Sequence, residues 1–448
     1  MDLKNPIVYF PIESRHRELS ARLLQAAYLV RAGVHVVIGV GHEIVGNIDV
    51  LPPGVFLVKG LNAVQRNLLM SARRAGHLPV VIDEECLGIA DPWYMMRDVA
   101  EGVGDHVHTI YCQGDVQRDA LHDRRGIPVE KLKLTGNPRV DLMREPFLVA
   151  LEDEAQSIRE QFGRFVLVNT NSGSINNHWG DLDRYRQILW QIGWADPNNP
   201  EDQLLVEDHI EHDRNNVLAV QAFVEEFTGR APDVPVVLRP HTSEKSDPWI
   251  EFARRFDTVT VVSDSEPQPW LLAAELVVTT GCTTAAEAVV MGKDAISLVV
   301  QPDHVRHPAF FVANKVAHQE TDAMRAAETA ASVLRGDRRS INADKSGRMS
   351  VLSEHIFDGS DGPAFVKIGE HLVSLIRRDA VDDVDGGKFE TLLLNDTLTI
   401  SKVAWKKAYF SLREVRSRYS AVLKTLAWET DGPIRQIGHG TYLLSPVV

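Results

Sequence analysis

Short runs of β-branched and aliphatic residues alternate with stretches of helical periodicity, and this alternation constrains the fold more than any other feature of the chain. The first series of runs is IVYFPIE (7–13), VHVVIGV (34–40), GVFLVKG (54–60), PVVIDEE (79–85), VHTIYCQG (107–114) and, as a sixth candidate, LKLTGNP (132–138). The second series is RFVLVNTN (164–171), VPVVLRPH (234–241), TVTVVSD (258–264), ELVVTTG (275–281) and DAISLVV (294–300). Strands that alternate with helices predict βαβ units in parallel sheets, buried on both faces.

The two series predict an α/β protein with two Rossmann-like, doubly wound domains. We expect the first domain at residues 1–148 and the second at 149–340, starting with a helical, acidic stretch at 149–162. Residues 341–448 are expected to form a helical extension that packs back across the domains. Because ligands of such sheets bind at the carboxyl ends of the strands, the expected site is a cleft that the two domains face.

Composition excludes several classes of protein. The 448 residues carry a formal charge of −14 with a pI of about 5.7, which argues against a nucleic-acid binder held by phosphate contacts. The three cysteines are scattered, and no histidine cluster has metal-ligand spacing, so no metal site is predicted. The apolar run at the N-terminus is too short for a secretory signal, and no stretch approaches the roughly 20 residues of a membrane span. We expect a cytoplasmic protein.

The stretch TTGCTTAAEA (279–288) follows one of the predicted buried strands. Gly281 allows a turn that exposes backbone N–H groups, and Thr283 or Thr284 can begin the next helix, whose N-terminus attracts anions. Glu287, one turn into that helix, is placed to accept hydrogen bonds from a ribose diol. The alternative needs no ligand, because Thr284 and Glu287 also have the spacing of a capping box.

Two further strand ends in the second series carry polar residues. VVLRPH places Arg239 and His241 where they could grip a phosphate or a carboxylate; the alternative is an arginine paired with a neighbouring acid and a surface histidine. VNTNSGSINN places Asn171 and Ser172 in a loop that suits the close approach of a polar ligand, although such a loop is also simply a good turn.

Two strands of the first series are followed by acidic residues. Glu13 follows the first strand, and Glu84 and Glu85 follow the fourth. A carboxylate that faces a cleft can act as a general base or a nucleophile if burial or a neighbouring charge tunes it. The alternative is that Glu13 pairs with a local cation and that acids of the DEE triplet are solvated.

Two features near the surface are weaker signals. Two DxD pairs, at 181–183 and 383–385, lie in predicted loops and are not interpreted as metal sites. The predicted helical stretch 389–428 has a basic face, with seven Lys or Arg between 401 and 425. This face could lie against anionic lipid headgroups of the inner membrane; a solvated face is the alternative.

With these residues assembled, the chain resembles bacterial surface-polysaccharide biosynthesis proteins of the two-domain GT-B glycosyltransferase architecture. The resemblance spans most of residues 6–300 and is carried by PIESRHRELSARLLQAA, VIDEECLG, LTGNPRVDLM (134–143), VNTNSGSINN, LRPH and TTGCTTAAEAVVMGK. The last two are similar to turns in glycosyltransferases that take nucleotide-activated donors, including CDP-glycerol and CMP-Kdo users. Thr242 departs from the pattern, because related transferases often have a second proline there.

The resemblance implies that the C-terminal domain binds the donor and that the N-terminal domain supplies acceptor contacts and the catalytic acid or base. Gly281, Thr283 and Thr284 would hold the donor phosphate and Glu287 the ribose. Arg239 and His241 would neutralise the leaving phosphate. GT-B enzymes generally need no bound metal for this, and no cofactor is expected besides the donor substrate.

The implied function is transfer of a sugar or polyol phosphate from a nucleotide-activated donor, such as a CMP-Kdo-type donor, to a surface polysaccharide or lipid-linked acceptor. One alternative is a nucleotide-sugar 2-epimerase on the same scaffold, which needs no acceptor. Another is a non-catalytic scaffold of a polysaccharide assembly complex. The sequence leaves open whether the sugar's configuration is inverted or retained.

Overall fold

The computed structural model describes residues 6–263, 266–299, 307–356, 359–378, 409–429 and 432–446. Contacts group the chain into two compact units. The first unit contains residues up to 84, 98–150 and those from 356 onward, and the second contains 85–97 and 151–355. The sequence suggests three consecutive segments as domains, whereas both units of the structure are discontinuous in sequence.

The first unit is built on an eight-stranded sheet in the order β13-β14-β2-β1-β3-β4-β5-β6. Its strands are β1 (Ile7–Ile12), β2 (His35–Val40), β3 (Val55–Val58), β4 (Leu78–Ile82), β5 (Thr109–Cys112), β6 (Leu132–Leu134), β13 (Ile434–Gly438) and β14 (Thr441–Leu444). Strands β1 to β6 are the six that the apolar runs predict, and they pair in parallel. The hairpin β13–β14 is not predicted from the sequence, and it adds antiparallel strands to the edge of β2.

Gly39 explains how the hairpin reaches this edge. It lies opposite Thr441 in the ladder between β2 and β14. A Cβ atom at position 39 would lie only 2.7 Å from Thr441 Oγ1 and 2.9 Å from Thr441 Cα. The missing side chain of Gly39 therefore lets the two backbones approach closely enough to pair.

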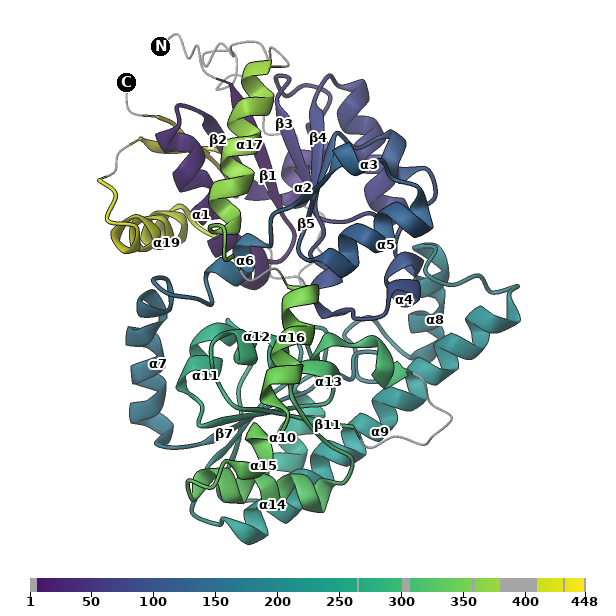
Figure 1. Cartoon of the computed structure of the whole chain (residues 1–448), viewed down its shortest axis with the longest axis vertical. Helices are drawn as coiled ribbons and strands as arrows, with labels where there is room; N and C mark the ends of the chain where they lie inside the picture. The colour runs from purple at the N-terminus through teal and green to yellow at the C-terminus, as the bar shows by residue number, and fades with distance from the viewer. Residues whose placement is uncertain are drawn as a thin grey trace. The chain divides into compact units, whose positions relative to one another are not determined.

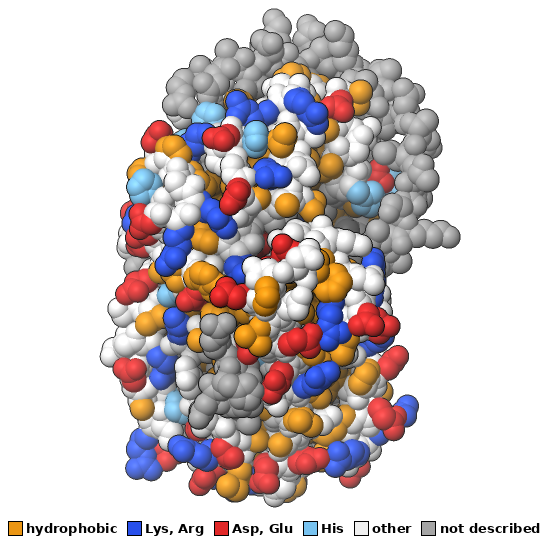
Figure 2. Space-filling view, turned by 90° about the vertical axis from the view of Figure 1, so that its right-hand side faces the viewer, with side chains coloured by type: hydrophobic (Ala, Val, Ile, Leu, Met, Phe, Trp, Pro, Cys, Tyr) orange, Lys and Arg blue, Asp and Glu red, His pale blue; other side chains and the backbone are white. Residues whose placement is uncertain are grey.

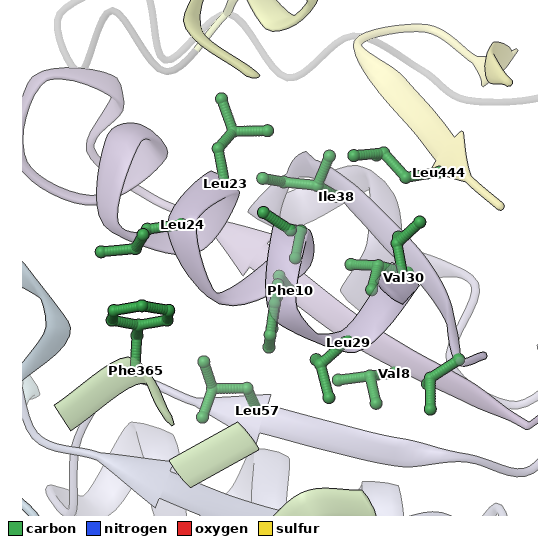
Figure 3. Close-up of a cluster of buried hydrophobic side chains, with 14 of the residues drawn as sticks. Val8, Phe10, Leu23, Leu24, Leu29, Val30, Ile38, Leu57, Phe365 and Leu444 are labelled. Atoms are coloured by element: carbon green, nitrogen blue, oxygen red, sulfur yellow. The ribbon is translucent and has the colours of Figure 1, made fainter. Parts of the chain in front are cut away.

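The hydrophobic core of the first unit is formed by residues from both the N-terminal and the C-terminal parts of the chain. Its helices are α1 (Arg15–Arg31), α2 (Gly41–Gly46), α3 (Ala63–Arg74), α5 (Asp115–Arg125), α6 (Pro138–Asp141), α17 (Ala364–Arg378) and α19 (Leu412–Thr425). Helices α17 and α19 both pack on α1 (Figure 1). Figure 3 shows Leu24 of α1 beside Phe365 of α17, and Leu444 of β14 on the side of Ile38. The C-terminal region thus contributes apolar side chains to a core that the N-terminal strands begin.

The second unit has a six-stranded parallel sheet in the order β12-β11-β10-β7-β8-β9. Its strands are β7 (Val166–Asn169), β8 (Val236–Arg239), β9 (Val259–Val261), β10 (Leu276–Thr279), β11 (Ala295–Leu298) and β12 (His318–Glu320). The first five correspond to the predicted runs. Strand β12 is short and polar, which explains why no apolar run marks it.

Helices cover this sheet as a doubly wound fold requires (Figure 1). The helices of this unit are α4 (Pro92–Arg97), α7 (Leu148–Phe162), α8 (Leu182–Gln191), α9 (Pro200–Arg230), α10 (Asp247–Ala253), α11 (Pro267–Ala273), α12 (Thr284–Val290), α13 (Val312–Val316), α14 (Ala323–Leu334), α15 (Arg339–Asn342) and α16 (Lys345–His355). The longest is α9; Asn199 caps its first turn by accepting from Glu201 N at 3.0 Å. Phe223 and Phe227 in its second half are fully buried in the core of this unit.

Parts of the predicted C-terminal extension lie outside the described residues. These are 389–408 of the predicted basic helix, with Lys402, Lys406 and Lys407, and the pair 383–385. Helix α19 accounts for the later part of that prediction. Among the described residues, none of the helices is long and apolar enough to cross a membrane. On the face shown in Figure 2, acidic and basic side chains are interspersed.

Candidate functional site

Three polar residues end neighbouring central strands of the second unit and lie side by side. Thr279 of β10 is in register with Asn169 of β7, and Asn169 is in register with Arg239 of β8. Residues in register on parallel strands point to the same face of the sheet. Their exposed fractions are only 0%, 2% and 6%, respectively. The sequence predicts that Arg239 and the TTG turn share one edge of the sheet, and the structure brings them together there.

Arg239 is the buried cation of this row. Burial lowers the pKa of its guanidinium, while the negative charges of Glu287 and Glu266 act to raise it. This arrangement is similar to the alternative given above, in which Arg239 pairs with a neighbouring acid and needs no ligand. The guanidinium is also a charge that a phosphate could engage, because arginine binds phosphate through two parallel hydrogen bonds.

Several polar atoms around Arg239 have unused hydrogen-bonding capacity. Within the described part of the chain, Thr279 Oγ1, Thr280 Oγ1 and Asn169 Oδ1 are buried without a hydrogen-bond partner. The amide nitrogen of Asn169 donates to Thr284 Oγ1 at 3.0 Å, which links β7 to the start of α12. Unsatisfied buried polar atoms cost free energy. A polar ligand at this edge could satisfy them if neighbouring side chains moved to admit it.

The turn after β10 has the left-handed backbone that its glycine predicts. Gly281 has φ +89°, a conformation that side-chain-bearing residues rarely adopt. Helix α12 begins at Thr284, and Thr283 at its N-cap makes no side-chain capping bond. Thr284 and Glu287 therefore do not form the capping box that their spacing allows. Helix α12 has only seven residues, and Arg239 supplies the positive charge of the row of strand-end residues beside it.

Thr283 and Glu287, two other predicted donor ligands, are already in contact with protein. A Cβ atom on Gly88, in the 3₁₀ turn η1 (Cys86–Gly88), would lie 2.6 Å from Thr283 Oγ1. Glu287 is 2% exposed, and Gln268 Nε2 donates to its carboxylate at 3.3 Å. Gln268 thus orients the side chain that the resemblance assigns to the ribose.

A buried carboxylate that the sequence analysis missed organises the loops after β7 and β8. Glu244, 2% exposed, accepts hydrogen bonds from Ser172 N, Ser172 Oγ and Thr170 Oγ1 at 3.0, 2.6 and 2.7 Å. It also accepts from His241 N and from Trp249 Nε1. The available signal was an acid three residues after Arg-Pro-His. Glu244 fixes the backbone positions from which the loop residues could reach a ligand.

The remaining predicted ligands of these loops differ in exposure. Ser172 is buried and already gives both its amide and its hydroxyl hydrogen to Glu244. Asn171 is half-buried, and His241 is exposed with Nδ1 2.7 Å from Ser243 Oγ. Asn171 and His241 are thus better exposed to a ligand than Ser172, whose role as a ligand stays a prediction.

The three candidate carboxylates of the first series are not alike. Glu13 is half-buried and paired with Lys59. Glu84 is 3% exposed and forms a buried ion pair with Arg22, with Oε1 2.5 Å from Nη2. Its Oε2 has no hydrogen-bond partner among the described residues. Glu85 is exposed and belongs to the second unit.

Glu18 is a buried acid that the sequence analysis did not single out. It is 1% exposed and accepts hydrogen bonds from the backbone N–H groups of Glu13 and Ser14 at 3.2 and 3.1 Å. Burial raises the pKa of Glu18, and the charge of Glu84 acts in the same direction. Its contacts are those of a carboxylate that caps the start of α1.

The described residues give no positive evidence for a metal centre. Among them, no group of three or more His, Cys, Asp or Glu side chains is arranged to hold a metal ion. Asp181 caps α8 by accepting from Arg184 N at 2.9 Å, which is a structural use of the first DxD pair. Metal independence itself stays a prediction.

With this geometry in place, the chain can be compared with known proteins. No family model matches it, and no curated protein matches it. Among solved structures, it is similar to the wall teichoic acid polymerase TagF: a form soaked with CDPG has 9% identity and a TM-score of 0.50, covering 84% of this chain and 89% of that chain. A second TagF structure has 10% identity and a TM-score of 0.50, covering 84% and 90%. The UDP-GlcNAc 2-epimerase from Neisseria meningitidis, bound to UDP-GlcNAc, has 12% identity and a TM-score of 0.49, covering 83% and 100%.

At these identities the likeness establishes the fold and leaves the activity to the chemistry of the site. The predicted fold class, two Rossmann-like α/β domains of the GT-B type, is confirmed. The cleft that the two domains are expected to face stays a prediction.

Proposed function

We propose that this protein is a glycosyltransferase of the GT-B type. It would move a sugar or polyol phosphate from a nucleotide-activated donor to a surface polysaccharide or lipid-linked acceptor. The observation that carries the proposal is the row Thr279–Asn169–Arg239, a buried cation beside unused hydrogen-bonding atoms at the carboxyl edge of a parallel sheet. Ligands of doubly wound folds bind at this edge.

In the proposed donor complex, the phosphate lies at Arg239, with the hydroxyls of Thr279 and Thr280 as further donors. His241, exposed at the same strand end, supplies a second donor and, when protonated, a second positive charge. As the bond to the phosphate breaks, negative charge grows on the leaving group. Positive groups already fixed in place stabilise that charge without reorganisation, which is often the largest catalytic contribution.

The acceptor hydroxyl needs a base, and the proposal takes it from Glu13, Glu84 or Glu85. Glu84 has a carboxylate oxygen with no partner among the described residues, whereas Glu85 is the most exposed of the three. Because Glu84 is buried, an acceptor could reach it only if neighbouring side chains move. Replacing each in turn by glutamine should identify the base by a loss of about 10²–10⁴ in kcat with nucleotide affinity unchanged.

The first experiment is thermal denaturation with CMP, CDP, UDP, GDP or ADP. A ligand at 100 times its Kd stabilises the folded state by about 2.7 kcal/mol, so a cognate nucleotide should raise Tm by several degrees. Arg239→Lys keeps the charge but loses the planar fork, and it should lose most of this shift. Arg254→Lys is the matched control, since Arg254 lies on the surface in an exposed ion pair with Glu251.

The outcomes separate the candidate functions. If none of the five nucleotides shifts Tm, the donor site is rejected, and the non-catalytic scaffold becomes the leading hypothesis. If a uridine nucleotide binds and a UDP-sugar is epimerised without any acceptor, the protein is an epimerase. Turnover of a nucleotide donor that depends on an added glycan or lipid-linked acceptor would support the transferase.

A further inference from the structure

Four polar side chains lie on one face of the middle of α9. They are His209, His212, Asp213 and Asn216, spaced as successive turns of one helix face require. His212, Asp213 and Asn216 are 3%, 2% and 2% exposed, respectively. Buried polar groups are costly unless they find partners. The hydrogen-bond partners of these side chains therefore identify the segments that this face of α9 holds in place.

Asp213 holds the loop after β7. Its Oδ2 accepts from both the backbone N–H and the hydroxyl of Ser174, at 2.8 and 2.6 Å. Ser174 is itself 2% exposed and lies in the loop that carries Asn171 and Ser172. Two hydrogen bonds to one carboxylate oxygen, one of them from the backbone, fix the path of this loop.

Asn216 holds the turn after β10. Its side-chain nitrogen donates to the carbonyl oxygen of Thr280 at 3.4 Å and lies 3.1 Å from His212 Nε2. Thr280 directly precedes Gly281, the residue with positive φ. The contact therefore orients the peptide group that enters the turn.

Helix α9 is well anchored at both ends, so it can act as a rigid support. Near its start, Asp202 forms an ion pair with Arg97 of α4 at 2.7 Å. Its second half is buried in the apolar core of the same unit. A rigid element that bonds to two loops fixes their separation as well as their individual positions.

We propose that Asp213 and Asn216 are positioning residues of the donor site, holding the loop at 171–174 and the turn at 280–284 at the separation that the nucleotide phosphates require. This inference rests on the proposed function, because it concerns the same site. Neither residue is assigned a contact with substrate.

The charge of Asp213 gives the proposal a readout that a purely structural role lacks. Burial raises the pKa of Asp213 to about 6. The groups that act on it are His209 and His212 on its own helix, Ser174 from the loop, Glu244 beyond that loop and Tyr185 from α8. Protonation would weaken the acceptor for Ser174, so nucleotide affinity should fall as pH drops through about 6.

The test measures nucleotide affinity by calorimetry between pH 5 and 8 for the wild type, Asp213→Asn, Asn216→Ala and Arg214→Ala. Asp213→Asn and Asn216→Ala should each weaken affinity by about tenfold or more, as displaced active-site groups typically do. In Asp213→Asn only the contribution of Asp213 to the pH dependence should be lost, so the ratio of wild-type to variant affinity should change through about pH 6. Ionisation of the nucleotide and of His241 is common to both proteins and cancels in that ratio. Arg214 is exposed on the same turn of α9, so Arg214→Ala should match the wild type.

Hydrogen–deuterium exchange of the same proteins without nucleotide provides an independent measurement. Exchange should rise at 171–177 in Asp213→Asn and at 280–284 in Asn216→Ala, and at neither segment in Arg214→Ala. Ser174→Ala removes the hydroxyl contact from the other side and replaces Asp213→Asn if that variant fails to fold. If the wild type binds no nucleotide, the proposed function fails while exchange still decides whether α9 positions the loops. Normal affinity, pH profile and exchange in these variants would overturn the proposal.

Discussion

The carboxyl edges of the two sheets both carry charged residues, but they use them differently. In the first unit these charged side chains have partners: Arg22 pairs with Glu84, Lys59 pairs with Glu13, and Glu18 accepts from backbone N–H groups at the start of α1. The one exception among them is Oε2 of Glu84, which has no hydrogen-bond partner among the described residues. In the second unit, the row at Arg239 includes hydroxyl and amide atoms that have no partner among the described residues. Engaged charges stabilise a fold, whereas unused polar atoms at a strand end would gain partners if side chains moved to admit a ligand. This difference favours the second edge as the proposed donor site, and the predictions below test the difference.

The largest effect is expected in the first unit. Glu84→Ala would leave Arg22 buried without its partner, which typically costs about 3–5 kcal/mol. Equilibrium urea denaturation measures the change. Glu85→Ala, one residue along the chain and exposed, should stay within about 0.5 kcal/mol of the wild type. Similar values for the two variants would mean that the Arg22–Glu84 pair contributes little to the first unit.

Acid should weaken both units through two histidines whose pKa is lowered by burial. Burial lowers the pKa of His35 in the first unit and of His209 in the second from 6.5 to about 4. The unfolded chain binds these protons more readily, so the free energy of unfolding is highest above pH 6.5 and falls as pH drops towards 4. Each histidine should account for about 3 kcal/mol of that loss.

Substitution can separate the two histidines. His35→Phe and His209→Phe should each flatten the acid limb of a plot of unfolding free energy against pH. The raised pKa of Asp213 acts in the opposite direction between pH 6 and 4, because the folded protein binds that proton more readily. Asp213→Asn should therefore steepen the acid limb. An unchanged slope in all three variants would contradict these assignments.

Two buried threonines at the same edge of the second sheet give the sharpest contrast. Thr170 donates to the buried carboxylate of Glu244 at 2.7 Å, so Thr170→Val should cost about 1–3 kcal/mol. The hydroxyl of Thr279 has no partner among the described residues, so Thr279→Val should be neutral or slightly stabilising. Nucleotide titration should then show weaker binding by Thr279→Val. Equal destabilisation by both changes would contradict the division between engaged and unused groups.

The glycines that flank α12 are expected to give a further, moderate loss of stability. Gly281 and Gly292 both have positive φ, +89° and +75°, so alanine at either position should cost about 1–2 kcal/mol. Only Gly281 lies in the turn after β10, and Gly281→Ala should therefore weaken nucleotide binding while Gly292→Ala does not. Thermal denaturation with and without the cognate nucleotide measures both effects. Equal loss of the nucleotide-induced shift in both would mean that the turn has no special role.

Local sequence predicts the strands and their polar ends because both are local properties. Runs such as IVYFPIE and ELVVTTG are apolar enough to identify buried strands, and the residues that follow them lie at one edge by topology. The contacts that organise the site are not local. Ser172 and Glu244 are 72 residues apart, Ser174 and Asp213 are 39 apart, and Arg22 and Glu84 are 62 apart.

The hairpin β13–β14 was missed for a related reason. Its strands are short, and their partner β2 lies near the other end of the chain, with Leu444 opposite Val36. Nothing in the local pattern of residues 434–444 says which sheet they join. The same limit applies to the domain boundaries, because α17 and α19 complete a core that α1 begins.

This pairing has a consequence for how the chain folds as it leaves the ribosome. Strand β2 is made early, but the strand that covers its edge is β14, which is made after the whole second unit. Until β14 arrives, β2 presents an open strand edge, the kind of surface that other nascent chains can pair with. Residues 151–355 can meanwhile complete their own sheet. The unit that is begun first is therefore finished last, and the edge of β2 stays open for longer than it would if its partner were made next.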